Sequence, residues 1–389
     1  MIHTPIAIFL IVLLTILVGS VLFKRMHIPS TVGMIALGIA IGPYGFNLLE
    51  RDASFLIFGG VGILYLMFQA AVEIDMFHMK AQIRGGVLFG LFSFTIPLLA
   101  GVFGTRYLLG QGWLTAFLVA SMLASHTLIT YPTVSKFGLQ NTRPAVVAVC
   151  GTIVAVMLAL LVLAGVAQFS ETGGYSTALL FRLLALIVVF MLVVGYSFPV
   201  VTRWFFKHTT DPVAQYIFII ALVLTAALSA QWIGIEGILG AFYAGLVLNK
   251  MIPGRSPLMK NIRFVGDAIF IPYFLIGVGM LINVRVVVEG WSVLYAAAIL
   301  SLLALGSKWL ASFGAQRILR MNAVDRGLIF GLTGGKAAAT IAAVMIGYDA
   351  GLLGEDMMNA AVVMILLCCL VASVQTDRSA TVSYTHLTL

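Results

Sequence analysis

The sequence has few charged residues, and this shortage decides which class of protein it can encode. Only 9% of its 389 residues are Asp, Glu, Lys or Arg, whereas 61% are hydrophobic. A soluble domain carries roughly 25% charged residues, so a soluble globular fold is excluded. The apolar residues form long runs, which indicates an all-α polytopic protein that crosses the lipid bilayer many times.

Cysteine is scarce as well. Cys150, Cys368 and Cys369 all lie within apolar runs, at spacings that fit neither a disulfide framework nor a metal site. We therefore expect no resident metal and no cofactor. No nucleophile and base stand in a catalytic pattern, so we expect no enzyme activity. No loop reaches the roughly 50 residues of a small domain, so the functional groups are expected in or beside the membrane.

Acidic residues are the rarer charged type, with 14 against 22 basic residues. In a soluble protein the net charge of +8 would suggest nucleic acid as a partner, but these basic residues lie in loops, where they set topology. Within the spans, Glu73 and Asp267 lie near predicted ends. Each carboxylate has two interpretations. It belongs to a proton or ion pathway, or it lies in the lipid headgroup zone. No carboxylate is predicted at the midplane.

Thirteen apolar runs predict thirteen transmembrane helices. They cover residues 5–23, 29–46, 54–74, 85–105, 112–135, 144–168, 176–202, 212–231, 235–249, 264–282, 288–316, 325–347 and 357–375. Sixteen basic residues fall on one side of the alternating loops and four on the other. The positive-inside rule then places the N-terminus outside and the C-terminus in the cytoplasm, and we expect a bacterial inner membrane.

Two of these runs are interrupted by polar residues, glycine and proline. The interruptions contain Ser125, His126, Thr127, Thr130 and Pro132 in the fifth run, and Gly334, Gly335 and Lys336 in the twelfth. Irregular backbone at membrane depth is tolerated only where it lines a protein-enclosed cavity, and a matched pair of broken spans points to a transporter's binding site. The two broken spans are seven spans apart, and because seven is odd they cross the bilayer in opposite directions. This predicts inverted repeats, spans 1–6 and 8–13, whose broken helices cross near the midplane.

The hydroxyl groups of Ser125, Thr127 and Thr130 have two interpretations. They are hard oxygen ligands suited to an alkali cation, or they bond to the interrupted backbone. His126 fits a proton relay and equally a structural histidine.

Lys308 lies within the eleventh span, nine residues before Arg317 and so about 13 Å along a helix. A buried ammonium at that depth needs a partner or must give up its proton. Lys308 is therefore predicted to carry a proton, or to neutralise the carbonyl ends of the broken helices, or both. Lys336 is either a second cation lining the cavity or a lysine bonded to unwound carbonyls.

Four motifs along the chain carry a resemblance to a known family. They are IPSTVG at 28–33, FQAAVEID at 68–75, GILGAFYAG at 237–245 and PYFLIGVGM at 272–280. With the thirteen-span layout, they make the chain resemble the monovalent cation:proton antiporter 2 family of sodium/hydrogen exchangers.

The resemblance implies a transport domain over residues 1–375 with three parts. These are a core bundle at about 54–168 and 264–375, a dimerising panel at about 5–46 and 212–249, and a linker helix at about 176–202. A homodimer in the lipid bilayer is implied, and Lys308 falls on the family's lysine of span eleven. The polar residues 376–389 are expected to be an unstructured tail at a truncation end.

The chain departs from the family pattern at one position. The family's ion-binding aspartate lies in span six, where this sequence reads GTIVAVM at 151–157 and the matching residue is Val156. Two hypotheses stay open. One is a secondary transporter that exchanges sodium or potassium for protons, with an altered coupling site and weak or electroneutral exchange. The other is an anion or organic-acid carrier, because the predicted midplane has lysines and no carboxylate.

Overall fold

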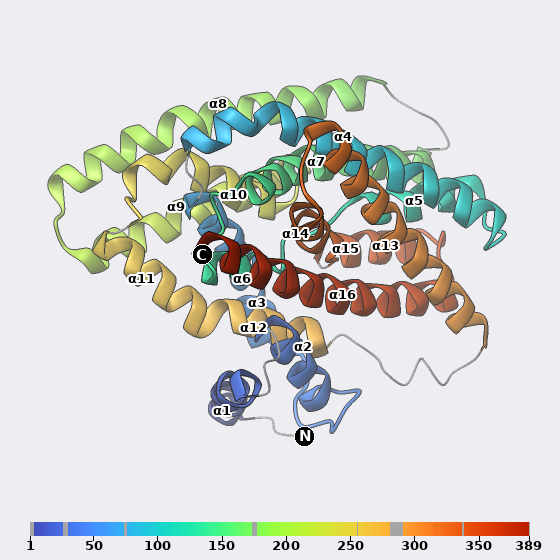
Figure 1. Cartoon of the computed structure of the whole chain (residues 1–389), viewed down its shortest axis with the longest axis horizontal. Helices are drawn as coiled ribbons and strands as arrows, with labels where there is room; N and C mark the ends of the chain where they lie inside the picture. Colours follow the sequence, from blue (N-terminus) through green and yellow to red (C-terminus); the bar gives the residue numbers. More distant parts are fainter. Residues whose placement is uncertain are drawn as a thin grey trace. The chain divides into compact units, whose positions relative to one another are not determined.

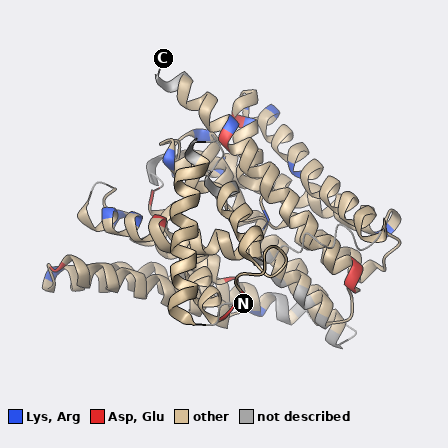
Figure 2. Cartoon of the chain, turned by 90° about the horizontal axis from the view of Figure 1, so that it is seen from below, with Lys and Arg blue, Asp and Glu red and all other residues tan. Residues whose placement is uncertain are grey.

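The computed structural model describes residues 4–25, 30–73, 76–172, 177–254, 256–280, 291–336 and 338–388. The motif residues at 28–29 and 74–75 therefore lie outside the described residues. Within the described ranges every regular element is a helix, as Figure 1 shows. Most of the ribbon carries neither acidic nor basic residues (Figure 2), in keeping with an integral membrane protein.

Most helices begin and end close to the predicted apolar runs. They are α1 (Pro5–Arg25), α2 (Ser30–Ile41), α3 (Ala53–Glu73), α4 (Met76–Tyr107), α5 (Trp113–Ala124), α6 (Tyr131–Lys136), α7 (Arg143–Thr172), α8 (Thr177–His208), α9 (Pro212–Trp232), α10 (Gly237–Leu248), the 3-10 turn η1 (Asn249–Met251), α11 (Pro257–Val265), the π-helical turn η2 (Gly266–Phe270), α12 (Ile271–Met280), α13 (Trp291–Leu319), α14 (Ala323–Gly334), α15 (Ala338–Asp349) and α16 (Glu355–Thr388). Of these, α4 begins well before its run and α16 ends well after its run.

Each of the thirteen predicted spans corresponds to one of these helices or to a consecutive set. Among the described residues, nine stretches are long and apolar enough to cross a bilayer, one of them formed by α11, η2 and α12 together. Spans two and nine are the short helices α2 and α10. Spans five and twelve are each split, into α5 with α6 and α14 with α15. The predicted all-α membrane fold is therefore confirmed.

Local sequence signals explain where several helices begin. Asp211 accepts hydrogen bonds from the backbone amides of Val213 and Ala214, and Pro212 follows it at the first helical position of α9. At the start of α14, Asn322 and Asp325 form a reciprocal capping box.

The expected unstructured tail at 376–389 is wrong for residues 376–388, which continue α16. The hydroxyl groups that made this stretch look irregular bond within the helix. Thr376 and Thr385 donate to the carbonyls of Ala372 and Thr381, four residues earlier. Ala380 is also fully buried, so the tail keeps part of an apolar face.

The described chain forms two compact units. Unit 1 comprises residues 1–50, 78–175 and 278–389, and unit 2 comprises residues 51–77 and 176–277. In unit 1, α14 packs against α7, α13 and α16, and α5 packs against α7 and α15. The broken helices thus lie beside α13, the helix that carries Lys308.

In unit 2, α10 packs against α3, α8 and α9, and α3 also contacts η2. Asn249 fixes the end of α3, because its side-chain amide donates to the carbonyls of Ala71 and Val72. The predicted core bundle, dimer panel and linker helix divide the chain differently from these two units, and that functional division stays a prediction.

Candidate functional site

The two broken helices meet at their breaks. The chain leaves helical structure after Ala124 and resumes it at Tyr131, with Pro132 inside the first turn of α6 and not in the break itself. The Thr127 amide donates to the Gly335 carbonyl over 3.1 Å, and the Thr130 hydroxyl donates to the Gly331 carbonyl over 3.3 Å. The predicted crossing of two broken spans is therefore present in unit 1.

Gly335 is required at this crossing because the two chains approach so closely. α14 ends at Gly334, and Gly335 follows it in an extended conformation. A Cβ atom at position 335 would lie 2.8 Å from a side-chain carbon of Ile129 and 3.2 Å from the carbonyl oxygen of Thr127. Real Cβ atoms essentially never approach another atom to 2.8 Å, so glycine permits the approach of the two breaks.

Lys308 is fully buried in α13, and its ammonium group joins three other segments. Its Nζ atom lies 2.8 Å from both the carbonyl and the hydroxyl oxygen of Ser93 on α4, and 2.7 Å from the carbonyl of Ala124 at the end of α5. The fourth contact is 2.9 Å to Nδ1 of His126 in the break. An ammonium has three hydrogens, so four contacts exceed what it can donate at once.

The hydrogen bonds of His126 place a hydrogen on Nε2 of its ring. Thr152 on α7 donates its hydroxyl hydrogen to the Ala148 carbonyl over 2.8 Å, so its oxygen accepts a hydrogen from His126 Nε2, 2.9 Å away. Nδ1 then faces Lys308. Either a charged lysine donates to a neutral imidazole, or a neutral lysine accepts from an imidazolium. Both arrangements hold one proton between the two nitrogens.

Lys336 lies in the second break and is fully buried. Its Nζ atom donates to the carbonyls of Leu123 and Ser125, over 2.7 and 2.5 Å. These carbonyls belong to the last residues of α5 and its C-cap, which have no partner within the helix. A cation at this end also opposes the negative pole of the helix dipole. The geometry matches the predicted lysine bonded to unwound carbonyls.

The hydroxyl groups of the first break bond to backbone. Ser125 donates to the Met122 carbonyl, and Thr130 donates across the crossing as described above. Thr127 is buried and contributes its backbone amide. Ser125 and Thr130 thus follow the interpretation in which hydroxyl groups satisfy the interrupted backbone.

Ser93 and Thr152 complete the site, and sequence reasoning missed both. Thr152 precedes the buried Val156 by four residues and so stands one turn before it on α7. It is also the only hydroxyl group in the apolar run at 144–168, which is a signal that the sequence offered. Ser93 gave no comparable signal, because Thr95 is close to it in the same span.

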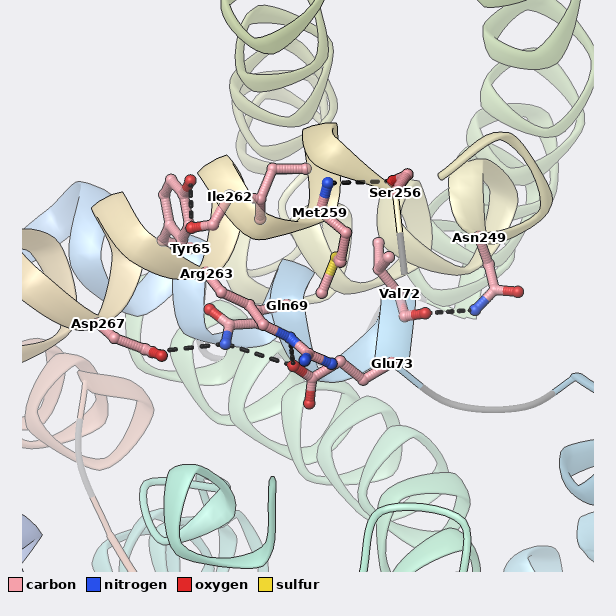
Figure 3. Close-up of polar contacts among 10 residues, drawn as sticks. All are labelled: Tyr65, Gln69, Val72, Glu73, Asn249, Ser256, Met259, Ile262, Arg263 and Asp267. Atoms are coloured by element: carbon pink, nitrogen blue, oxygen red, sulfur yellow. Dashed lines mark hydrogen bonds and ion pairs between the residues drawn. The ribbon is translucent and has the colours of Figure 1, made fainter. Parts of the chain in front are cut away.

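Glu73 and Asp267 lie in unit 2, in a separate polar cluster that Figure 3 shows. Glu73 ends α3 and pairs with Arg263 of α11, with 2.9 Å between Oε1 and Nε. Gln69, one turn earlier on α3, lies between Glu73 and Asp267, and its Nε2 is 3.4 Å from an oxygen of each. The sequence predicted the two acids, but not Gln69 or Arg263.

Comparison with known proteins finds one family whose model matches nearly the whole chain. The model of the family described as sodium/hydrogen exchanger, transmembrane, matches residues 9–378. The Na(+)/H(+) antiporter NhaS5 of Synechocystis sp. is 32% identical over 385 residues, which cover 97% of this chain and 55% of that protein. The chain thus spans about half the length of that relative. The probable Na(+)/H(+) antiporter 3 of Methanocaldococcus jannaschii is 30% identical over 353 residues, with 90% of each chain covered.

Among solved structures, the sodium proton antiporter MjNhaP1 from Methanocaldococcus jannaschii has the same fold. It superposes with a TM-score of 0.74 at 15% sequence identity, over 99% of this chain and 98% of that one. At this identity the likeness concerns the fold alone.

Proposed function

Because the chain belongs to the sodium/hydrogen exchanger family, we propose that it is a secondary transporter that exchanges sodium or potassium for protons by alternating access. The two relatives named above are Na(+)/H(+) antiporters, which supports sodium and protons as the cargo. The family consists of transporters, in line with the expectation that the chain is not an enzyme. Two broken helices crossing in one unit are the arrangement with which inverted-repeat transporters build their sites.

The observation that carries the proposal is the Lys308–His126 pair. In place of the family's span-six acid, α7 presents Val156, and Thr152 supplies the polar contact to the ring. The pair takes up one proton and then carries one positive charge; it releases that proton and becomes neutral. Exchange therefore requires no carboxylate beside Lys308, and one proton moves for each monovalent cation.

The alternative is an anion or organic-acid carrier, which free ammonium groups at the crossing would favour. Both ammonium groups are engaged: Lys308 by two carbonyls, a hydroxyl and an imidazole, and Lys336 by two carbonyls. Donors already occupied in this way leave little for an anion to bind, so this geometry supports the cation exchanger.

Membrane placement follows from the loop charges and completes the proposal. We infer an N-terminus outside and a C-terminus in the cytoplasm of a bacterial inner membrane, because sixteen of the twenty basic loop residues fall on one side. A homodimer through residues 5–46 and 212–249, beside a moving core at 54–168 and 264–375, is proposed on the family resemblance. Residues 176–202 would link the two parts.

The experiment is proton flux into proteoliposomes that contain the full chain, with a pH-sensitive dye inside and an imposed pH gradient. Sodium, potassium and choline are compared as chloride salts, and chloride is compared with gluconate at constant sodium. Proton flux that requires sodium or potassium and ignores the anion is expected. Flux that follows chloride and is the same in choline would contradict cation exchange and support the anion carrier.

A further inference from the structure

Two arginines from neighbouring helices of unit 1 lie against the same aromatic ring. The Cζ atom of Arg317 is 5.0 Å from the ring centre of Phe313, and the Cζ atom of Arg326 is 5.9 Å from it. Arg326 also lies over Trp309, at 5.4 Å, and the two rings are nearly parallel with centres 5.5 Å apart. A guanidinium within about 6 Å of an aromatic ring centre is attracted to the ring face. The rings therefore bring together two positive charges, one from α13 and one from α14.

No acid offsets these two charges. Neither Arg317 nor Arg326 pairs with a carboxylate among the described residues. Arg326 donates to the uncharged side-chain oxygen of Gln316 over 3.0 Å. The carboxylate of Asp325 accepts from the Asn322 amide as part of the cap of α14. Like charges repel each other, so the two guanidinium groups favour an anion beside them.

The face of α13 that leads to these arginines is apolar and exposed. Leu302, Trp309 and Phe313 follow one another at intervals of seven and four residues, so they form one stripe along the helix. Arg317 continues this apolar stripe four residues later. Leu302 is 74% exposed and Trp309 is 43% exposed. At 1.5 Å per residue the stripe is about 16 Å long, close to half of the roughly 30 Å apolar core of a bilayer. Its length therefore suits one acyl chain of one leaflet.

The arginines lie where the headgroups of that leaflet begin. Arg317 is in the last turn of α13, and Arg326 is in the first turns of α14. A tryptophan ring prefers the membrane interface, and arginine extends its charged end from there towards water. This end of the two helices is the proposed cytoplasmic end, and the cytoplasmic leaflet is the one that carries a negative surface potential.

We propose that Arg317 and Arg326 bind the headgroup phosphate of an anionic phospholipid such as phosphatidylglycerol, whose acyl chain lies along the apolar stripe of α13. Planar guanidinium groups bind phosphate oxygens through paired N–H donors. The net negative charge of the lipid offsets the repulsion between the two arginines. A zwitterionic lipid such as phosphatidylcholine supplies no net charge, because its own ammonium group balances the phosphate.

The bound lipid joins two helices that take part in the crossing. The same α13 carries Lys308, and α14 leads to the break at Gly335. A headgroup held by one arginine from each helix fixes these two helix ends relative to each other. The lipid site is additional to the proposed exchange and does not depend on which ion the protein transports.

The first experiment uses Trp309 as a reporter in the full-length protein. Bromine atoms on an acyl chain quench a tryptophan that they contact. The protein is reconstituted in phosphatidylcholine that contains increasing fractions of brominated phosphatidylglycerol or of brominated phosphatidylcholine. The signal of Trp309 is the difference between the wild type and Trp309→Phe. Half-maximal quenching of Trp309 is expected at an at least tenfold lower fraction of brominated phosphatidylglycerol. Equal fractions for the two lipids would overturn the site.

The second experiment removes the two charges. Arg317→Gln with Arg326→Gln is expected to abolish the preference for brominated phosphatidylglycerol at Trp309. Arg203→Gln is the matched control, because Arg203 is exposed on α8 at the same proposed side of the membrane and donates to the Pro199 carbonyl. It should keep the preference.

A preference that survives in the double variant overturns the site. A preference that Arg203→Gln lowers equally also overturns it, because the effect would then come from net charge alone. If the double variant does not yield monodisperse protein, Arg317→Gln alone takes its place, since Arg317 is exposed. It should lower the preference at least threefold, and an unchanged preference would contradict the proposal.

Inorganic phosphate distinguishes a lipid site from a site for a soluble anion. Sodium phosphate is compared with sodium chloride at equal ionic strength, because salt itself screens exposed charges. Quenching of Trp309 by brominated phosphatidylglycerol is expected to be the same in both. Displacement of the lipid by phosphate would overturn the lipid site and assign the two arginines to a soluble anion.

Discussion

At the level of single residues, the proposed exchange depends on Lys308 and His126 holding one proton between them. Nζ of Lys308 and Nδ1 of His126 lie 2.9 Å apart, and only one of them can donate to the other. Burial raises the cost of a charge, and the carbonyls of Ser93 and Ala124 offset part of it. A carboxylate site would alternate between negative and neutral, whereas this pair alternates between positive and neutral.

Lys308→Arg tests whether this lysine gives up its proton. Arginine does not deprotonate in proteins, so the site would stay charged, and we expect cation-dependent proton flux to fall by about tenfold or more at every pH. Lys308→Ala should abolish the pH dependence of transport. The measurement is proteoliposome flux across a series of pH values. Normal activity and a normal pH profile in Lys308→Arg would leave Lys308 only the role of neutralising carbonyls.

His126→Gln tests the other half of the pair. Glutamine can still donate to Thr152 and accept from Lys308, but it does not titrate in the physiological range. We expect the variant to fold and to show a pH profile of transport that differs from the wild type. His208→Gln is the matched control, since His208 is exposed at the end of α8 and bonds to the Trp204 carbonyl. Identical pH profiles for His126→Gln and the wild type would remove the ring from the proton path.

At the level of elements, the broken helices were predictable and their partners were not. The hydroxyls before Pro132 and the pair Gly334–Gly335 revealed the two breaks, because such residues are costly within a continuous membrane helix. Ser93 and Thr152 come from helices whose contacts depend on packing, which one sequence does not encode in a readable pattern. The unstructured tail predicted from the polar residues is wrong for 376–388, because the hydroxyl groups of Thr376 and Thr385 bond to carbonyls inside α16.

Lys336→Met tests the role of the second lysine at the end of α5. The substitution leaves the carbonyls of Leu123 and Ser125 without their donor, and we expect a loss of about 1–3 kcal/mol in the free energy of unfolding. Thermal unfolding in detergent measures it, with Lys207→Met, at an exposed position of α8, as the control. The pH profile of transport should stay unchanged. A folded Lys336→Met protein whose pH dependence is lost would instead place Lys336 on the proton path.

At the level of the whole molecule, the proton on the Lys308–His126 pair sets the charge of the two loaded states. In the proton-loaded state the pair carries +1. In the cation-loaded state the pair is neutral and the bound cation supplies +1. Both states carry the same charge, so we expect electroneutral exchange of one monovalent cation for one proton. The sequence alone led to the same expectation, through the absence of an acid at Val156.

The most direct test of this central claim is the balance point of sodium and proton gradients in proteoliposomes, measured with and without an imposed membrane potential. A potential of about 100 mV is worth about 2.3 kcal/mol for each net charge moved, so an electrogenic exchanger shifts its balance point clearly. We expect net flux to stop when the sodium and proton gradients are equal, at every imposed potential. A balance point that moves with the potential, as for two protons per cation, would contradict the one-proton pair.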